Sequence, residues 1–162
     1  MQNDFISADT IEENIRFGRD ISDEAIIRAA KIAQAHDFIT SFEEGYKHML
    51  SSKGTNVSGG QRQRILIARA IAGCPEILIL DDSSSALDYK TDALLRQALS
   101  KEMANSTVIT VAQRISSVKN CERILVLEKG DVIGYGTHEE LLKNSAPYTE
   151  ISVSQMGGVL VD

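Results

Sequence analysis

The sequence predicts an α/β protein, in which a helical part is followed by a part where strands alternate with helices. Helix caps and helical apolar spacing fill the first part, whereas the unbroken apolar run Ile77–Leu80 opens the second. Such a run is typical of a strand in a parallel sheet that is covered on both faces. The segment Lys90–Ala104 then places apolar residues on one face of a helix. We therefore expect a mostly parallel sheet joined to an α-helical subdomain.

Capped helices are predicted at the start of the chain. Thr10 precedes the segment Ile11–Phe17, and Glu13 stands three residues later, in the capping-box position. Ser22 opens the next predicted helix, which runs toward Ala35. A hydroxyl side chain at such a position accepts a hydrogen bond from the free N–H groups of the first helical turn.

A third predicted helix begins with two consecutive glycines and ends at Gly73. Ser58 and Gln61 form an S-x-x-Q capping box at its start. Gly59 and Gly60 lie between them, although each glycine lowers helix stability by roughly 1 kcal/mol relative to alanine. A backbone without Cβ atoms can be approached closely, and helix-start N–H groups favour anions, so this turn predicts a phosphate contact. A flexible helix start without a ligand is the alternative.

The strand Ile77–Leu80 ends in two carboxylates, Asp81 and Asp82. Parallel strands deliver ligand-binding residues at their carboxyl ends. In a phosphoryl-transfer site the first carboxylate would hold Mg²⁺ through its water shell, and the second would orient or deprotonate the attacking water. A helix cap or the start of a loop is the alternative for this pair.

The rest of the chain predicts one more strand, a hairpin and a closing helix. Thr107–Val111 has the composition of a strand, and Ile124–Leu127 and Val132–Tyr135 flank a turn that contains glycine. Thr137 with Glu140 forms a second capping box.

Taken in order, these segments resemble the ATP-binding cassette (ABC) family, and in particular the nucleotide-binding domain of exporter-type ABC transporters. Val57–Gln61 is similar to the signature motif, with valine in place of the usual leucine, and Ile77–Asp81 is similar to the Walker B strand. Ser85–Asp88 is similar to the D-loop, and Gly130–Leu141 to the closing hairpin and helix. Gln2 is similar to the Q-loop glutamine, with an ordinary terminal residue as the alternative.

This resemblance implies a partial P-loop NTPase core that uses ATP and Mg²⁺. The metal contacts are expected from Gln2 and Asp81, and the catalytic positions are Asp82 and Gln113. The residues expected to contact the nucleotide are Gln2, Ser58, Gly59, Gly60, Gln61, Asp81 and Asp88. The predicted organisation is the Q-loop with the helical subdomain and signature helix, the second half of the ATPase core, and a disordered tail, over residues 1–73, 74–155 and 156–162.

Two positions depart from the family's pattern. Asp82 replaces the catalytic glutamate, which brings the carboxylate one methylene, about 1.5 Å, closer to the backbone. Misplacement on that scale can lower a rate about a hundredfold. Gln113 replaces the switch-loop histidine and can hydrogen-bond a phosphate without carrying a proton. Because the signature matches while these residues do not, the chain resembles the degenerate half of a heterodimeric exporter.

Charge and composition limit the predicted partners. The net charge of −6 and the lack of a Lys/Arg cluster argue against nucleic acid. No run approaches the roughly eighteen apolar residues of a membrane span. The resemblance to ABC exporters implies as partners a second nucleotide-binding domain and a transmembrane domain, at the cytoplasmic face of the membrane. Cys74 and Cys121 are predicted to be reduced structural cysteines, and His36, His48 and His138 to be exposed.

No G-x-x-x-x-G-K-[ST] loop occurs in the sequence, although the family carries this Walker A loop upstream of the Q-loop. We therefore expect a C-terminal portion of a nucleotide-binding domain that, alone, binds ATP feebly and hydrolyses none measurably. Exposed sheet edges would favour self-association. The transported substrate is not predictable from these residues.

Three classes of function fit the pattern to different degrees. The first is an ATPase subunit of a membrane exporter. The second is a non-catalytic regulatory module that binds nucleotide, which Asp82 and Gln113 favour. The third, a soluble ABC ATPase that acts on DNA or ribosomes, is disfavoured because no basic face is visible.

Overall fold

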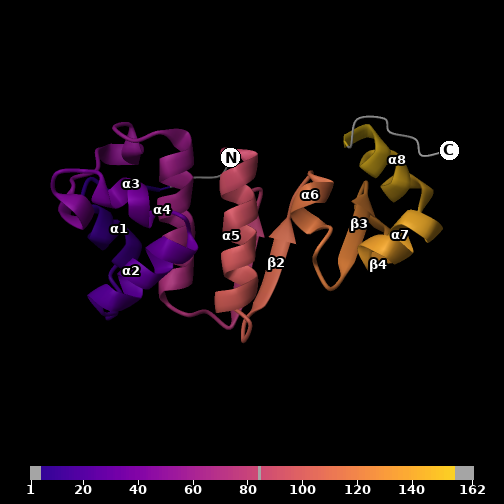
Figure 1. Ribbon diagram of the computed structural model, residues 1–162, viewed down its shortest axis with the longest axis horizontal. Helices are drawn as coiled ribbons and strands as arrows, with labels where there is room; N and C mark the ends of the chain where they lie inside the picture. The colour runs from indigo at the N-terminus through magenta and orange to yellow at the C-terminus, as the bar shows by residue number, and fades with distance from the viewer. Residues whose placement is uncertain (1–4, 84, 156–162) are drawn as a thin grey trace. The chain divides into compact units, whose positions relative to one another are not determined.

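The computed structural model describes residues 5–83 and 85–155, which fall into two compact units divided between Val111 and Ala112 (Figure 1). Gln2 and the predicted tail, residues 156–162, lie outside the described residues. Both units combine helices with strands, so the predicted α/β class is confirmed. The described strands form one parallel pair and one antiparallel pair, a smaller share of parallel pairing than the sequence predicts.

The first unit is mostly helical up to the end of its fourth helix (Figure 1). Its helices are α1 Ile11–Arg16, α2 Asp23–Ile32, α3 His36–Thr40, α4 Gly59–Ala72 and α5 Tyr89–Glu102, with short 3-10 turns η1 Gly45–Lys47 and η2 Ser52–Gly54.

The predicted N-caps Thr10 and Ser22 are confirmed, whereas the predicted capping-box role of Glu13 is wrong. Thr10 Oγ1 accepts a hydrogen bond from the Glu13 amide at 3.2 Å, and Ser22 Oγ accepts one from the Ala25 amide at 3.3 Å. The Glu13 carboxylate accepts a hydrogen bond from Arg16 Nε at 2.9 Å. The cap of α1 is therefore formed by the threonine, and the glutamate serves an ion pair one turn along the helix.

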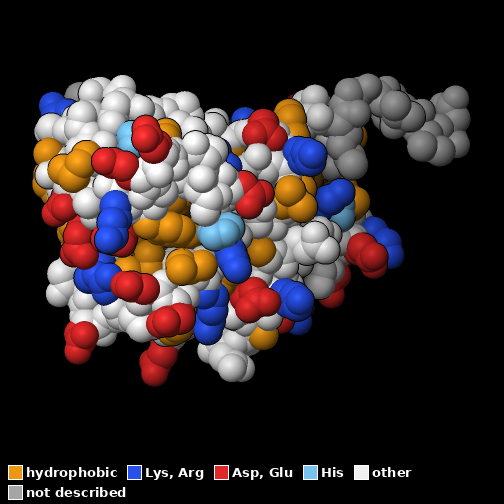
Figure 2. All heavy atoms as spheres, turned by 60° about the vertical axis from the view of Figure 1, so that its left-hand side comes forward, with side chains coloured by type: hydrophobic (Ala, Val, Ile, Leu, Met, Phe, Trp, Pro, Cys, Tyr) orange, Lys and Arg blue, Asp and Glu red, His pale blue; other side chains and the backbone are white. Residues whose placement is uncertain are grey.

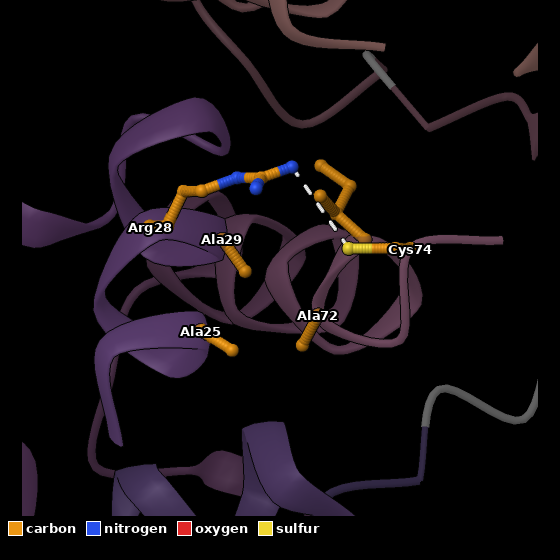
Figure 3. Close-up of a pocket in the computed structure, with 6 residues that line it drawn as sticks. Ala25, Arg28, Ala29, Ala72 and Cys74 are labelled. Carbon is orange, nitrogen blue, oxygen red and sulfur yellow. Dashed lines mark hydrogen bonds between the residues drawn. The ribbon is translucent and has the colours of Figure 1, made fainter. Parts of the chain in front are cut away.

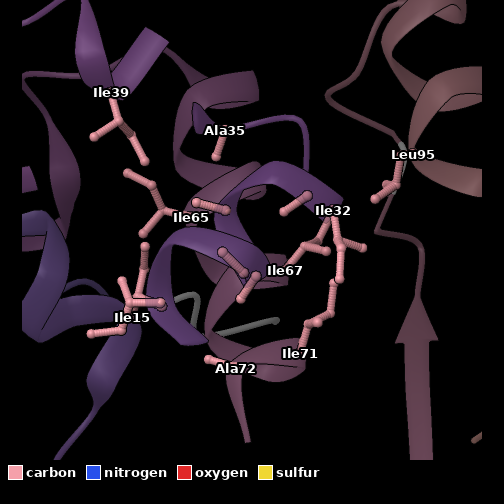
Figure 4. Close-up of a cluster of buried hydrophobic side chains, with 14 of the residues drawn as sticks. Ile15, Ile32, Ala35, Ile39, Ile65, Ile67, Ile71, Ala72 and Leu95 are labelled. Carbon is pink, nitrogen blue, oxygen red and sulfur yellow. The ribbon is translucent and has the colours of Figure 1, made fainter. Parts of the chain in front are cut away.

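The core of the first unit is built mainly from isoleucine. Figure 4 shows side chains of α1, α2, α3 and α4 meeting in one cluster, with Leu95 of α5 beside it. The fully or almost fully buried isoleucines shown there are Ile15, Ile32, Ile39, Ile65, Ile67 and Ile71. Burial of each such side chain contributes about 2 kcal/mol, so this cluster fixes the position of α4 against its neighbours.

The helix α4 ends at Ala72, directly before the predicted glycine, but Gly73 does not have the left-handed conformation of a glycine cap. Gly73 has φ −84°, and the positive φ falls on Cys74, at 46°. A Cβ atom at Gly73 would lie 2.7 Å from a terminal nitrogen of Arg19. A side chain at position 73 would therefore displace the end of the flexible Arg19 side chain, which donates to the carbonyls of Ile15 and Arg69.

Two parallel strands, β1 Ile77–Asp81 and β2 Thr107–Val111, complete the first unit. Leu78 and Leu80 are buried, whereas Ile77 and Ile79 are 61% and 63% exposed. The prediction that both faces of this strand are covered is therefore wrong for the described chain. Successive side chains of a strand point to opposite faces, so an unbroken apolar run does not report how many faces are covered.

The described part of the second unit contains an antiparallel hairpin and three helices. The strands are β3 Ile124–Glu128 and β4 Asp131–Gly136, and the helices are α6 Ile115–Val118, α7 His138–Asn144 and α8 Ala146–Gln155. Lys129 and Gly130 form the turn with φ of 53° and 94°, as a two-residue turn with two left-handed positions requires. Thr137 and Glu140 form the predicted capping box at α7.

The histidines are half-buried, so the prediction that they are exposed is wrong. His36 Nδ1 forms a 2.9 Å hydrogen bond with the hydroxyl of Tyr46, whose pKa burial raises to about 12. His48 stacks on the ring of Phe42, and His138 pairs with a buried tyrosine of α8. Each ring packs against an aromatic partner, which spacing among the histidines alone does not reveal.

Candidate nucleotide-binding site

The first turn of α4 carries the predicted signature residues in a complete capping box. Ser58 Oγ accepts a hydrogen bond from the Gln61 amide at 3.1 Å, and Gln61 Oε1 accepts one from the Ser58 amide at 2.9 Å. Helix geometry leaves the N–H groups of Gly59 and Gly60 without an intrahelical acceptor. Ser58 and Gly59 are exposed. The turn therefore presents two amides, at the positive end of a long helix, to whatever approaches it.

The two glycines of this turn have different surroundings. A Cβ atom at Gly60 would lie 3.1 Å from the carbonyl oxygen of Ala86 and 3.9 Å from a methyl group of Leu87. A Cβ atom at Gly59 would meet nothing within 4 Å. Gly60 thus allows the segment before α5 to pack against α4, whereas no contact among residues 5–83 and 85–155 requires a glycine at position 59.

Asp81 and Asp82 lie where the sequence predicts them, at the carboxyl end of β1, and both are exposed. Asp82 has φ 47°, in the left-handed region, which aspartate tolerates better than most residues. Its amide donates to the Val111 carbonyl at 3.0 Å, and its carbonyl accepts from Ser85 Oγ at 3.0 Å. The backbone that carries the candidate catalytic carboxylate is therefore held on both sides in an unusual conformation.

Asp88 caps α5. One carboxylate oxygen accepts a hydrogen bond from the Thr91 amide at 2.9 Å, and the other accepts one from the Thr91 hydroxyl at 2.7 Å. These bonds, the one from the amide first, lower the pKa of the Asp88 carboxyl below its ordinary value. A contact between Asp88 and nucleotide stays a prediction, since the cap accounts for the carboxylate in the free chain.

Gln113 lies in the second unit, in the loop that precedes α6, and its side chain is exposed. Its backbone carbonyl accepts a hydrogen bond from Gln155 Nε2 at 2.7 Å. Gln113 and Asp82 belong to different compact units. Their meeting in one site stays a prediction.

A buried polar cluster around Asn14 of α1, which we call the hub, joins α4 to the first described residues. It was not predicted from the sequence. Asn14 is 1% exposed, and its Oδ1 accepts hydrogen bonds from the Ser7 amide at 2.9 Å and from Arg69 at 3.0 Å. Arg69 of α4 also donates to the carbonyls of Asn14 and Phe5, at 2.6 and 2.7 Å. The signal available in the sequence is a lone asparagine within the apolar spacing of Ile11–Ile15.

Arg69 is half-buried, and its guanidinium lies 4.4 Å over the ring of Phe17. Burial lowers its pKa, and the charge of nearby Arg19 acts in the same direction. Backbone carbonyls and a ring face therefore accommodate this cation, so the segment just after the predicted Q-loop is tied to α4 by charge-assisted hydrogen bonds.

The cavity drawn in Figure 3 lies between α2 and the end of α4 and holds about 20 Å³. Arg28 and Cys74 meet at its rim, with the guanidinium 3.9 Å from Sγ. This volume suits about one water molecule and is too small for a nucleotide.

On the face shown in Figure 2, cationic and anionic side chains are interspersed. In the parts of the chain that the structure covers, no helix is both long and apolar enough to span a membrane.

Comparison with known proteins decides the family. Residues 1–85, more than half of the chain, match the family model described as ABC transporter. The chain belongs to the ABC transporter family. It is 46% identical over 151 residues to the mitochondrial potassium channel ATP-binding subunit of Mus musculus, covering 93% of this chain and 21% of the relative. It is 49% identical over 152 residues to the ABC transporter ATP-binding protein YknU of Bacillus subtilis, covering 93% and 26%.

This ABC transporter chain also resembles a solved structure of a bacterial Atm1-family ABC exporter with ATP bound. The TM-score is 0.90 at 34% identity, and the match covers 97% of this chain and 28% of the exporter chain. The resemblance to exporter-type nucleotide-binding domains is thereby confirmed. The chain spans about a fifth to a quarter of the length of the curated relatives named above.

Proposed function

We propose that this chain belongs to the ATP-binding subunit of an ABC exporter, and that the first turn of α4 contacts ATP held mainly by a second nucleotide-binding domain. The observation that carries this proposal is the open space at Gly59 beside the packed Gly60. No contact with the described residues explains the first glycine, whereas the close approach of a phosphate to bare amides does. The likeness to an ATP-bound exporter supports the same assignment.

The chain's own Walker B residues fit a nucleotide site that hydrolyses slowly. Asp81 is an exposed carboxylate at a strand end, and Mg²⁺ in such sites is held by one or two carboxylates together with phosphate oxygens. Bound Mg²⁺ would neutralise phosphate charge. Asp82 is shorter than the glutamate of the family and is held at φ 47° by its backbone partners. Gln113 can donate to a phosphate oxygen but transfers no proton.

The proposed partners are a second, hydrolytic nucleotide-binding domain and a transmembrane domain, which would hold the chain at the cytoplasmic face of the membrane. Gln2 would contact Mg²⁺ in this arrangement, and Asp88 would lie near the interface with the partner. This placement is supported by the family match and by the position of Asp88 at the start of α5.

A regulatory role is the second candidate function. Asp82 and Gln113 both weaken hydrolysis without removing nucleotide contacts, as a sensor of bound ATP would require. The mouse relative is named as the ATP-binding subunit of a mitochondrial potassium channel, which supports a role for this chain in binding ATP within a larger assembly. The two functions converge if hydrolysis takes place only at the partner's site.

The test is turnover at each site of the assembled pair. Asp82→Asn is expected to leave most of the ATP turnover in place, while removal of the partner's catalytic glutamate abolishes it. Gly59→Asp, which places a carboxylate at the open position, is expected to lower turnover at the partner's site about a hundredfold or more, because it displaces a phosphate contact. If Asp82→Asn slows turnover as much as the partner's change does, the assignment of a slow site to this chain is wrong.

A further inference from the structure

The last residue of α8 holds the loop that carries Gln113. Gln155 Nε2 donates to the Gln113 carbonyl at 2.7 Å, and Gln155 Oε1 accepts from the Ile115 amide at 2.8 Å. The two bonds fix the backbone on both sides of Arg114. The Gln155 side chain therefore holds both sides of the turn although it lies forty residues away in the sequence. We call its two hydrogen bonds, to Gln113 and to Ile115, the bracket.

The bracket supplies a helix cap that α6 lacks locally. Arg114 occupies the N-cap position of α6 and makes no side-chain capping hydrogen bond. The Ile115 amide is one of the N–H groups that a helix start leaves without an intrahelical partner. Gln155 Oε1 accepts from this amide, and Nε2 of the same side chain holds the carbonyl of Gln113, the residue at the family's switch position.

The reach of Gln155 is set by the packing of α8. Tyr148, Ser152 and Gln155 follow one another at i, i+4 and i+7 and so share one face of the helix. Tyr148 and Ser152 are each 2% exposed, and Tyr148 joins the buried cluster that includes Ile115 of α6. Because both helices are anchored in this small core, the amide of Gln155 is held opposite the loop.

The chemistry requires an amide side chain of this length. Glutamine presents a donor and an acceptor together, whereas glutamate has no donor, lysine and arginine have no acceptor, and asparagine is one methylene shorter. The two bonds of Gln155 therefore could not both be made by another charged or shorter residue at position 155.

We propose that Gln155 is a positioning residue for nucleotide retention, which acts by holding the Ala112–Arg114 loop so that the Gln113 side chain meets the terminal phosphate. This inference rests on the proposed role of Gln113 in the slow nucleotide site. Loss of the bracket frees the loop, and the phosphate contact of Gln113 is made for a smaller fraction of the time. The end of α8 thereby sets the residence time of nucleotide at this chain's own site.

The test measures the release of labelled ATP from the slow site of the assembled transporter, in which the partner's catalytic glutamate is replaced so that its own site does not turn over. Gln155→Leu is expected to speed release about threefold to tenfold, the range that loss of one hydrogen bond gives. Gln113→Ala is expected to speed it to a similar extent, and the double variant no further. Gln97→Leu, the same change at an exposed position of α5, serves as the matched control and should leave release unchanged.

Gln155→Glu separates the two arms of the bracket. The carboxylate can still accept from the Ile115 amide but repels the Gln113 carbonyl, so the Ile115 amide stays protected from hydrogen exchange while release of ATP is as fast as in Gln155→Leu. In Gln155→Leu itself, exchange at Ile115 is expected to rise about fivefold.

The outcomes distinguish the two proposals. If Gln113→Ala leaves release unchanged, the proposed role of Gln113 is wrong, and the inference about Gln155 fails with it. If Gln113→Ala speeds release while Gln155→Leu does not, or if the effects of the two changes multiply in the double variant, only the inference about Gln155 is overturned.

Discussion

Substitution of the two signature glycines by alanine should separate stability from function. At Gly59 a Cβ atom meets nothing within 4 Å, so Gly59→Ala gains helix propensity with no steric cost. The gain is up to about 1 kcal/mol. At Gly60 the new Cβ lies 3.1 Å from the Ala86 carbonyl oxygen, and that backbone must move by a few tenths of an ångström. The steric cost there offsets the gain in propensity.

Thermal unfolding of the two variants measures this difference. A stabilisation of about 1 kcal/mol raises the melting temperature of a unit of this size by roughly 4 °C. We expect Gly59→Ala to melt at the same temperature as the wild type or up to that amount higher, and Gly60→Ala to melt below it. The order matters more than the absolute values, because both changes affect the unfolded chain equally.

Gly59→Ala is expected to lower ATP turnover although it does not lower stability. A methyl group at position 59 stands where a phosphate would approach, so Gly59→Ala should lower ATP turnover of the assembled transporter at least tenfold even though the fold is not weakened. Unchanged turnover would show that no phosphate approaches the first turn of α4. A lowered melting temperature for Gly59→Ala would show a contact within the chain that the structure lacks, and would refute the reasoning from open space.

Three further predictions concern the hub, the cap and the slow site. Asn14→Leu leaves the Ser7 amide and one nitrogen of Arg69 without their buried acceptor. Urea denaturation should therefore show a free energy of unfolding lower by about 3 kcal/mol. A decrease below about 1 kcal/mol would show that the hub rearranges at little cost. Asp88→Ala should destabilise α5 at neutral pH and Asp88→Asn much less. Because folding lowers the pKa of Asp88, its charge stabilises the fold at pH values above the ordinary pKa of 3.8. The amount by which the wild type exceeds Asp88→Asn in free energy of unfolding should therefore vanish as the pH falls through the folded-state pKa. A difference between these two free energies that does not change with pH would contradict this. Asp82→Glu and Gln113→His should each raise turnover at this chain's own site less than tenfold, as measured by single-turnover hydrolysis. Together they should raise it by more than the product of the two single gains, since both a well-placed carboxylate and a proton carrier are required. A combined gain equal to that product would show that the two residues act independently.

Local chemistry was predictable from the sequence because its rules act within a few residues. The capping boxes at Ser58 and Thr137, the strands and the two-residue hairpin turn all follow from the side chains at fixed offsets. The position of Asp82 at a strand end follows in the same way.

Features that depend on distant segments were not predictable. The hub joins Asn14 to Arg69 across 55 positions, and the bracket of Gln155 reaches 42 positions to Gln113. No local pattern marks either pair. The exposure of Ile77 and Ile79 depends on what covers the sheet, and the positive φ of Asp82 depends on the backbone partners that hold it. Gly73 was placed correctly at the end of α4, but the close approach of Arg19 comes from the segment between α1 and α2, far away in the sequence.

The most direct test of the central claim is the position of the two signature amides in an ATP-bound structure of the assembled transporter. The account predicts that the N–H groups of Gly59 and Gly60 lie within about 3 Å of terminal phosphate oxygens of a nucleotide whose other contacts come from the partner subunit. Amides that face solvent, or a nucleotide held by this chain's own Walker B strand at that position, would contradict it.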